Sequence, residues 1–432
     1  MGNTVGIVGG GAAGMMAAVT AARRGGKVTL LEGNDRLGKK ILSTGNGKCN
    51  LGNEKLGAED YYTGRPDILE ECLRRFGTGD TISFFQGIGL LVKSRNGYLY
   101  PACEQAAAVL DALRYEVRAA GVEVVTDFKV QSIERGRRTG RFRVQGTGGY
   151  CSFDRVILAC GGKAAPRTGS DGSGYELAGQ LGHGLAPTVP ALVQLKCREE
   201  SLKAVAGVRA DAHIVVYFQG KPAAQERGEL QLTEYGVSGI PMFQLSRTVN
   251  YILAGERTHS KTYQSAGQRE KRPERGTVPG EDVEIEIDFL PDYTDEEYRA
   301  LCAARKPLRR QRTVEEFFTG LLHKKLMLLF IKLAGLKPGE AAGEADERKL
   351  NRVYELCRHW RLHVTGSNSY DSAQVCAGGV LLDEVTGELE SKLVPGLYFA
   401  GEILDVDGRC GGYNLQWAWS SGFVAGCGAA AL

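Results

Sequence analysis

Three glycines near the start of the chain have the spacing of a dinucleotide-binding turn. Gly9, Gly11 and Gly14 form the pattern G-x-G-x-x-G between an apolar run, Thr4 to Val8, and an alanine-rich stretch, Met15 to Arg24. In such a turn the first glycine permits the tight bend, the second lets a pyrophosphate approach the backbone, and the third lets the helix pack on the strand. The helix N-terminus then stabilises the anion. The alternative is a glycine-rich turn that serves packing alone.

An acidic residue follows where this fold places a ribose-binding carboxylate. Glu32 ends the next apolar run, Lys27 to Leu31, and would accept hydrogen bonds from a ribose diol. No arginine stands directly beside it to neutralise a ribose phosphate. The sequence therefore favours FAD or NAD over NADP at this position.

Strands and helices alternate over the first 190 residues. Apolar residues recur at helical spacing from Asp67 to Phe85 and from Ala106 to Ala120, and a second glycine-rich turn runs from Gly161 to Gly174. This pattern predicts a nucleotide-binding architecture with a small antiparallel insert. The expected strands are Val122 to Val125, Phe128 to Glu134, Arg141 to Gln145 and Val156 to Ala159, and a further helix is expected over Tyr175 to Leu181.

After Pro190 the pattern changes to strands with no helical crossover between them, which predicts a second domain that is mainly β. The expected strands include His213 to Phe218, Glu229 to Leu232 and Val283 to Phe289.

The last third of the chain is expected to contain a loop, several helices and a return to the first domain. The polar stretch from Gly255 to Asp282 has little to bury and predicts a mobile loop. Thr294 to Leu350 predicts several helices, the first capped by its threonine and later ones continuing through Val314 to Leu333. The strand-like Gly396 to Ala400 and the helical Gln416 to Ala430 suggest that the C-terminus re-enters the first domain.

The composition is that of a globular protein without a strong charge. Of 432 residues, 43% are hydrophobic and 24% charged, which is enough to bury sizeable cores. The formal net charge of +3 disfavours a nucleic-acid partner, and no apolar stretch is long enough for a membrane span. The chain begins with a strand-like segment instead of a signal peptide, and its 11 cysteines include no C-x-x-C. A reduced, cytoplasmic setting is therefore expected.

Four blocks of the sequence resemble those of one flavoprotein family. L-G-K-K is followed by T-G-N-G-K-C-N from Thr44 to Asn50, and further blocks run from Ile157 to Tyr175, from Glu315 to Leu326 and from Gly396 to Ala418. Together they span nearly the whole chain, and the first and last are far more specific than the glycine pattern. They are similar to those of the BaiN/YhiN-type flavoproteins, also described as the aminoacetone-oxidase family of FAD-binding enzymes.

The resemblance implies an α/β fold with a Rossmann-like FAD-binding domain of the glutathione-reductase type, built from both chain ends over residues 1–190 and 365–432. An inserted β-rich, barrel-like substrate domain would cover 191–290 and about 351–364, and a helical subdomain 291–350. FAD would be bound. No second G-x-G-x-x-G lies between Gly161 and Gly401, so NADH or NADPH would visit only transiently as electron donor.

The activity that the resemblance implies is that of a cytoplasmic, FAD-dependent oxidoreductase acting on a small molecule, as a monomer or homodimer. The favoured reaction is NAD(P)H-driven reduction of an activated C=C in an apolar enone such as a 3-oxo-Δ4 steroid or bile-acid intermediate, with hydride transfer through flavin N5. One alternative is an O2-dependent oxidase of a small amine, such as aminoacetone, that releases H2O2. Another is a non-redox or tRNA-associated flavoprotein.

The residue types in these blocks suit a flavin. The segment Gly45 to Asn50 offers backbone N–H groups for a pyrophosphate and for the isoalloxazine edge, although a surface turn would have the same composition. Gly411 and Gly412 precede a predicted helix at Asn414, so their amides and the helix dipole could stabilise negative charge near flavin N1 and C2=O. The alternative there is a glycine N-cap without a ligand.

Candidate site residues follow from the blocks and the resemblance, with Tyr413 as the expected proton donor. The catalytic candidates are Tyr413, Asn46, Lys48 and Arg409, and no metal is expected. The cofactor-binding candidates are Gly9, Gly11, Ala12, Ala13, Gly14, Glu32, Gly33, Lys40, Ser43, Gly45, Asn46, Gly47, Lys48, Cys49, Asn50, Val130, Ala159, Cys160, Gly161, Gly401, Glu402, Gly411, Gly412, Tyr413, Asn414, Leu415 and Gln416.

Some positions depart from the family's usual residues or allow other chemistry. The family usually has Arg where Lys48 stands and an acid where Arg409 stands, which would change how an anion or a substrate is held. Cys49 and Cys410 could form a redox pair, but two small residues lining a pocket is the favoured interpretation.

Overall fold

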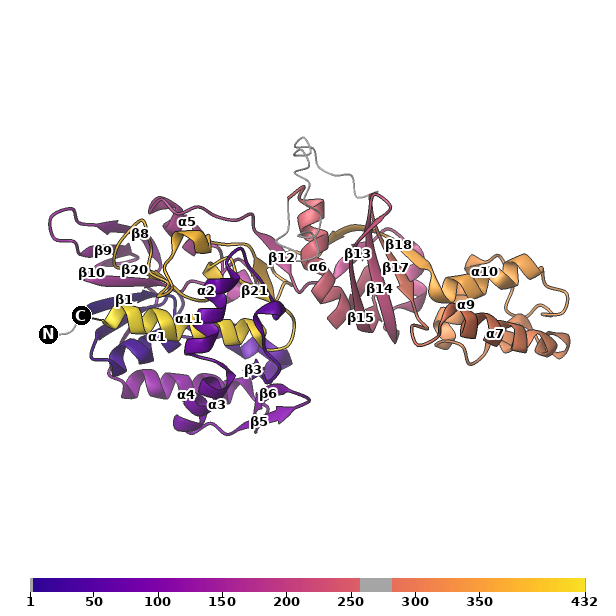
Figure 1. Cartoon of the computed structure of the whole chain (residues 1–432), viewed down its shortest axis with the longest axis horizontal. Helices are drawn as coiled ribbons and strands as arrows, with labels where there is room; N and C mark the ends of the chain where they lie inside the picture. Colours follow the sequence, from indigo (N-terminus) through magenta and orange to yellow (C-terminus); the bar gives the residue numbers. More distant parts are fainter. Residues whose placement is uncertain (1–2, 257–281, 432) are drawn as a thin grey trace. The chain divides into compact units, whose positions relative to one another are not determined.

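The computed structural model describes residues 3–256 and 282–431, which form two compact units (Figure 1). Of the described residues, the first unit contains 3–190 and 370–431, and the second contains 191–256 and 282–369. Most of the polar stretch from Gly255 to Asp282 lies outside the described residues, so its expected loop stays a prediction.

The first unit is built on a parallel five-stranded sheet with the order β20-β11-β1-β2-β7. Its central strands are continuous apolar runs, as expected for a parallel sheet that is covered on both faces. Val156 lies opposite Leu397, so strands from the two ends of the chain pair in one sheet, as predicted. The strands are β1 (Thr4–Val8), β2 (Lys27–Leu31), β7 (Glu123–Val125), β11 (Arg155–Leu158) and β20 (Leu397–Phe399).

Two helices from opposite ends of the chain pack on each other in this unit, α1 (Ala12–Arg23) and α11 (Tyr413–Ala430) (Figure 1). Helix α11 is apolar on nearly all sides and is buried accordingly. Its Gly422 permits the close contact, because a Cβ there would lie only 2.5 Å from the carbonyl oxygen of Ala13. The domain is thus closed by the two ends of the chain.

Shorter elements surround this core. The predicted antiparallel insert is present as β10-β9-β8, and a second three-stranded sheet has the order β3-β6-β5. The strands are β3 (Gly52–Asn53), β4 (Tyr61–Tyr62), β5 (Val92–Arg95), β6 (Tyr98–Pro101), β8 (Val130–Arg135), β9 (Phe142–Gly146), β10 (Gly149–Phe153), β12 (Val189–Ala191), β19 (Val375–Ala377) and β21 (Asp407–Gly408). The helices are α2 (Pro66–Arg75), α3 (Thr78–Gly87), α4 (Ala106–Ala119) and α5 (Ser173–Gln180).

The second unit contains a closed six-stranded barrel with the order β13-β16-β15-β14-β17-β18. Along β14, Ala212, Ile214 and Val216 are fully buried and alternate with more exposed residues, as the two-residue period of a strand requires. The predicted β-rich region is therefore confirmed. The barrel strands are β13 (Leu195–Cys197), β14 (Arg209–Phe218), β15 (Lys221–Leu232), β16 (Gly236–Gly239), β17 (Val283–Asp288) and β18 (Trp360–Ser367).

The expectation that no helix crosses between these strands is wrong. Helix α6 (Ile240–Leu253) follows β16 and buries Met242, Leu245 and Val249 at helical spacing. Pro241 stands in its first turn, where the missing N–H has no intrahelical partner to lose. The apolar period was present in the sequence, but the β-branched residues at both ends of the segment resemble strand residues.

Four helices form the rest of this unit, α7 (Asp295–Arg305), α8 (Val314–Phe318), α9 (Lys324–Leu333) and α10 (Glu347–Arg358). The predicted cap is confirmed, since the Thr294 hydroxyl accepts a hydrogen bond from the Glu297 backbone N–H and the Glu297 carboxylate accepts one from the Thr294 N–H. Helices α8 and α9 divide the stretch from Val314 to Leu333 at Gly320, whose φ is +89°.

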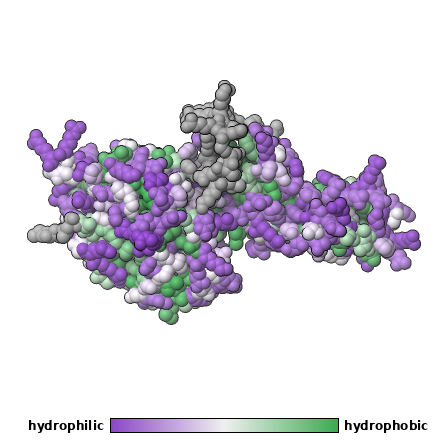
Figure 2. Space-filling model, in the orientation of Figure 1, coloured by the Kyte–Doolittle hydropathy of each residue, from purple (hydrophilic) through white to green (hydrophobic). Residues whose placement is uncertain are grey.

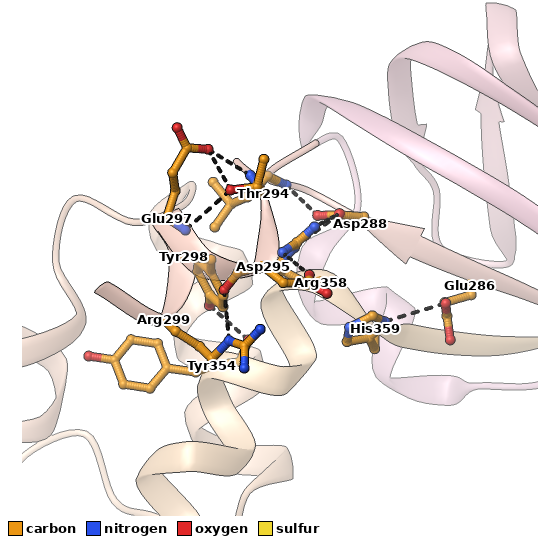
Figure 3. Close-up of polar contacts among 11 residues, drawn as sticks. Glu286, Asp288, Thr294, Asp295, Glu297, Tyr298, Arg299, Tyr354, Arg358 and His359 are labelled. Atoms are coloured by element: carbon orange, nitrogen blue, oxygen red, sulfur yellow. Dashed lines mark hydrogen bonds and ion pairs between the residues drawn. The ribbon is translucent and has the colours of Figure 1, made fainter. Parts of the chain in front are cut away.

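One arginine joins the helical part to the barrel (Figure 3). Arg358, at the end of α10, donates from Nε and Nη2 to Asp288 on β17 at 3.1 and 3.0 Å, and from Nη1 to Asp295 on α7 at 2.8 Å. Nearby, the Tyr298 hydroxyl donates to the carbonyl oxygen of Tyr354 at 2.8 Å. Because only 12% of the Arg358 side chain is exposed, these contacts hold a largely desolvated charge.

Hydrophilic residues cover most of the face drawn in Figure 2. Within residues 3–256 and 282–431, none of the helices is both long and apolar enough to pass through a bilayer. Helix α11, which has 18 residues and is largely apolar, is packed inside the first unit.

Candidate FAD-binding site

The glycine turn between β1 and α1 has the geometry of an anion site. Gly9 has φ +106°, and a Cβ there would lie 2.5 Å from the carbonyl oxygen of Ala159. A Cβ at Gly14 would lie 1.8 Å from the carbonyl oxygen of Gly9, so the turn itself requires this glycine. A Cβ at Gly11 would meet nothing within 4 Å, which leaves open space where a ligand can approach the backbone.

Among residues 3–256 and 282–431, no side chain caps the start of α1. Gly11 is the N-cap and offers no side-chain cap, and the first turn contains no acidic residue. The first N–H groups of a helix have no intrahelical acceptor, and together with the helix dipole they favour a bound anion. A pyrophosphate fits this end of the helix.

Glu32 lies beside the turn, at the end of β2, and is 8% exposed. One carboxylate oxygen accepts a hydrogen bond from the Gly10 N–H at 2.8 Å, and the other accepts from the Asn34 N–H at 2.8 Å and from its Nδ2 at 2.7 Å. A carboxylate offers about four lone-pair directions, so it can still accept a hydrogen bond from a ribose hydroxyl. The sequence did not predict the role of Asn34 in orienting Glu32.

Two further cofactor-binding candidates, Val130 and Cys160, lie near this carboxylate. Val130 is buried on β8, and the Phe128 N–H donates to the carbonyl oxygen of Glu32 at 2.9 Å, which brings this strand next to the end of β2. The Cys160 thiol donates to the carbonyl oxygen of Val8 at 3.4 Å, and burial raises the pKa of Cys160 to about 12. Cys160 therefore stays a neutral thiol at physiological pH.

The block from Gly45 to Asn50 forms an irregular, mostly exposed turn. Gly45 and Asn46 have φ of +56° and +53°, and Cys49 of +59°. The Asn50 side chain points inward, and its Oδ1 is buried without a hydrogen-bond partner among the described residues. Buried acceptors are almost always satisfied in folded proteins, so this oxygen suits an N–H or O–H of a ligand.

An ion pair joins the first block to the last. The Lys40 ammonium lies 2.7 Å from Glu402 Oε2, and Glu402 Oε1 accepts a hydrogen bond from the Cys376 N–H at 2.7 Å. The two side chains are 26% and 20% exposed, so they remain accessible to a ligand. The structure thus brings together two predicted cofactor residues that lie at opposite ends of the chain.

The turn before α11 meets the first block. Gly412 is the N-cap of α11 with φ +96°, and a Cβ there would lie 2.6 Å from Asn50 Oδ1. As in α1, the helix start has neither a side-chain cap nor an acidic residue in its first turn. This second uncapped helix end suits negative charge on a flavin ring.

Tyr413 is held by two residues that the sequence did not single out. Asn53 Nδ2 donates to the Tyr413 hydroxyl oxygen at 3.2 Å, and the Tyr61 hydroxyl donates to the Tyr413 carbonyl oxygen at 2.8 Å. Burial raises the pKa of Tyr413, so the phenol keeps its proton at neutral pH. Asn53 lies only three residues after Asn50. Extending the block that ends at Asn50 by three residues would have made Asn53 a candidate.

Several candidate side chains make contacts within the protein instead of reaching toward open space. Lys48 Nζ pairs with Glu104 at 2.7 Å. Asn414 exchanges hydrogen bonds of 2.8 Å with the backbone N–H and carbonyl of Gly408, which fixes the preceding loop. Gln416 is fully buried and is hydrogen-bonded to Thr81, Phe76 and Ser420.

Comparison with known proteins agrees with this architecture. Residues 3–428 match the family described as HI0933-like protein Rossmann domain. A 3-dehydro-bile acid delta(4,6)-reductase from Clostridium scindens is 41% identical over 431 residues, 99% of each chain. Ribosomal RNA dihydrouridine synthases from Haemophilus influenzae and Escherichia coli are 29% and 28% identical and align over 97% of this chain and 96% of their own.

One solved structure illustrates the fold. A 3-ketosteroid delta1-dehydrogenase from Sterolibacterium denitrificans, in complex with 1,4-androstadiene-3,17-dione, superposes with a TM-score of 0.51 over 99% of both chains at 13% identity. At this identity the likeness shows the fold alone.

The Rossmann sheet, the uncapped glycine turn and these matches define an FAD-dependent oxidoreductase. The chain belongs to the HI0933-like family, in agreement with its BaiN/YhiN-type sequence blocks.

Proposed function

We propose that the protein reduces a C=C bond conjugated to the carbonyl group of a steroid-like enone, with NADH or NADPH as electron donor. The observation that carries this proposal is the 41% identity, over 99% of both chains, to a 3-dehydro-bile acid delta(4,6)-reductase. Bound FAD supplies the hydride transfer that such a reduction needs. The protein supplies binding, orientation and a proton.

The cofactor would be held along the first unit by the groups described above. The open backbone at Gly11 and the start of α1 take the pyrophosphate, and Glu32 takes the ribose. The accessible pair of Lys40 and Glu402 provides charged groups for the hydroxyls of the ribityl chain, and the Asn50 carboxamide oxygen accepts a hydrogen bond from the ring. Each of these groups has an unused donor, acceptor or open space facing a ligand.

Tyr413 is the proposed proton donor to the substrate. Its oxygen already accepts a hydrogen bond from Asn53, which leaves the phenol hydrogen available for a second partner. Burial raises its pKa, while the positive charge of Arg409 acts in the opposite direction. A phenol that is neutral at working pH and stabilised as it loses its proton is suited to general-acid catalysis.

The test begins with the visible spectrum of the purified protein, reconstituted with FAD if needed. Bleaching of the flavin band by NADH or NADPH without oxygen, followed by recovery on adding a 3-oxo-Δ4 steroid, is the expected result. Peroxide release with aminoacetone in air, without bleaching by either nucleotide, would instead favour the amine oxidase. Tyr413→Phe should lower kcat by about 100-fold with little change in FAD affinity, because it removes the hydroxyl group that donates the proton and keeps the ring.

A second candidate is reduction of uridine in ribosomal RNA. Two dihydrouridine synthases align with 97% of this chain, and a uracil ring carries the same C=C and carbonyl arrangement as an enone. The lower identity and the formal net charge of only +3 make this the second choice. Mass spectrometry of rRNA incubated with the holoenzyme and donor would decide, since dihydrouridine is two hydrogens heavier than uridine.

A further inference from the structure

A small pocket of about 150 Å³ lies beside the Gly45 to Asn50 block in the first unit. Its lining consists of charged, phenolic and carboxamide side chains, Lys48, Arg95, Asn96, Tyr98, Tyr100 and Glu104.

The hairpin of β5 and β6 fixes one wall of this pocket. Its two turn residues, Asn96 and Gly97, both have positive φ, +55° and +88°, as in the tight turns that match the twist of paired strands. The turn sets Arg95 directly opposite Tyr98 in the antiparallel register. The positions of both residues are therefore defined by backbone pairing.

A carboxylate of the protein already occupies part of this cluster. Glu104 Oε2 lies 2.7 Å from Lys48 Nζ, and Oε1 lies 2.8 Å from Lys93 Nζ. These two lysines lower the pKa of Glu104 to about 2. Glu104 has φ +53°, an unfavourable conformation for a residue other than glycine.

The positive charges exceed the negative charge in this cluster. Among the described residues, Glu104 is the one acidic side chain that lines the pocket, whereas Lys48 and Arg95 line it too and Lys93 pairs with Glu104. Within residues 3–256 and 282–431, Arg95 forms no ion pair, and it is exposed. A second carboxylate would restore the charge balance, and a guanidinium can hold one with two parallel hydrogen bonds.

Residues that line the pocket contact residues of the proposed flavin site. Tyr98 packs against the turn before α11, since a Cβ at Gly411 would lie 2.6 Å from its ring. Asn53, which hydrogen-bonds Tyr413, also donates to the Gly411 carbonyl oxygen at 3.3 Å. Lys48 belongs to both the pocket and the Gly45 to Asn50 block. A molecule seated in the pocket therefore lies next to the residues assigned to the flavin ring.

We propose that this pocket binds a carboxylate of the substrate, with Arg95 as the main donor and the hydroxyls of Tyr98 and Tyr100 at its sides. Burial raises the pKa of Tyr100, so its hydroxyl remains a donor at neutral pH. The inference rests on the proposed function, because it assigns the carboxylate to the substrate of that reaction. It predicts a preference for enone acids over neutral enones of the same shape.

The experiment compares a 3-oxo-Δ4 cholenoic acid with its methyl ester on the FAD-bound enzyme. Both KM and direct binding by calorimetry without donor are measured for wild type, Arg95→Ala and Arg95→Lys. Arg95→Ala should weaken binding of the acid about tenfold or more, and Arg95→Lys less, because a charge-assisted hydrogen-bond pair is lost. The ester should be unaffected. Arg138→Ala, an exposed arginine in the turn after β8, is the matched control.

Glu104→Gln is a second variant, and it should change the affinity for the acid in the opposite direction. It removes the competing carboxylate, so binding of the acid should become several-fold tighter while that of the ester stays constant.

Equal effects of Arg95→Ala on acid and ester, or a raised KM for NADPH with an unchanged KM for the acid, would overturn the proposal. If the enzyme reduces no enone, the proposed function fails. The calorimetric preference for the acid, and its loss in Arg95→Ala, would then still establish a carboxylate site.

Discussion

The two units of this protein differ in how the N-termini of their helices are capped. In the second unit, α7, α8, α9 and α10 each begin with a side chain that accepts a hydrogen bond from a backbone N–H, namely Thr294, Thr313, His323 and Asp346. In the first unit, α1 and α11 begin at glycines with no side-chain cap and no acidic residue in the first turn.

A missing cap does not by itself mark a ligand, since α2, α3, α4 and α5 of the first unit also lack a side-chain cap. The starts of α1 and α11 differ from these in lying at the glycine turns assigned to the cofactor. A side-chain cap is worth about 1 kcal/mol, so α1 and α11 forgo stability that the helices of the second unit obtain from their caps. A bound anion can supply the missing interactions at α1 and α11. Helix α6 of the second unit also lacks a side-chain cap, but Pro241 removes one of its donors.

The largest expected effect comes from Gly14→Ala, which tests the uncapped turn. A Cβ at Gly14 would lie 1.8 Å from the Gly9 carbonyl oxygen, so the turn must open. We expect loss of bound flavin and a decrease in the free energy of unfolding of about 3 kcal/mol. Flavin absorbance after reconstitution and thermal melting measure both. Gly79→Ala is the control, because a Cβ on that exposed glycine of α3 meets nothing within 4 Å.

The next effect concerns the second unit, where Arg358 bridges Asp288 and Asp295. Arg358→Ala leaves Asp288 largely buried without its partner, and should lower the free energy of unfolding by about 2 kcal/mol without changing flavin content. Urea denaturation followed by circular dichroism measures the loss. Arg352→Ala, which breaks an exposed pair with Glu355, should cost no more than about 0.5 kcal/mol. Equal losses in the two variants would contradict the burial argument.

Gly11→Ala separates ligand binding from stability at the start of α1. Gly11 has φ −79° and open space around it, so alanine fits the FAD-free protein at a cost of about 1 kcal/mol or less. The added methyl group occupies the space for the pyrophosphate, and FAD should bind about tenfold more weakly or worse. Titration of the FAD-free protein by flavin fluorescence gives the affinity. Thr294→Ala should do the reverse, losing about 1 kcal/mol of stability with FAD affinity intact.

The smallest effect is a pH dependence of the first unit. His183 Nδ1 lies 2.9 Å from Glu384, and its Nε2 lies 2.8 Å from the Ser391 hydroxyl oxygen. Burial lowers the pKa of His183, although the Glu384 carboxylate opposes this shift. The unfolded chain therefore takes up a proton first, and stability should fall as the pH drops below about 6.5.

The comparison for this prediction is His183→Gln, measured by urea denaturation at several pH values. Between neutral and mildly acidic pH, the free energy of unfolding of wild type should fall further than that of the variant. The difference between the two decreases should be below about 1 kcal/mol. A variant with the same pH dependence as wild type would show that other groups cause it.

Much of the first unit was predictable because its signals are local. The turn of Gly9, Gly11 and Gly14 and the carboxylate of Glu32 lie within one strand–helix–strand segment, and the cap at Thr294 in the second unit likewise depends on residues close in sequence. The structure confirms the strand, turn and helix around them. Helix α6 was missed because its ends are β-branched and it follows three strands, a context that favours another strand.

The sequence by itself determined the fold class, the glycine turn and the identity of the blocks that surround the proposed flavin, because these depend on backbone conformation and short spacing. Only the tertiary structure decided which of those residues act together. Lys40 meets Glu402 and Lys48 meets Glu104, and Gln416 turns into the core. These outcomes depend on contacts between residues that lie far apart in the chain, and such contacts leave no local pattern in one sequence.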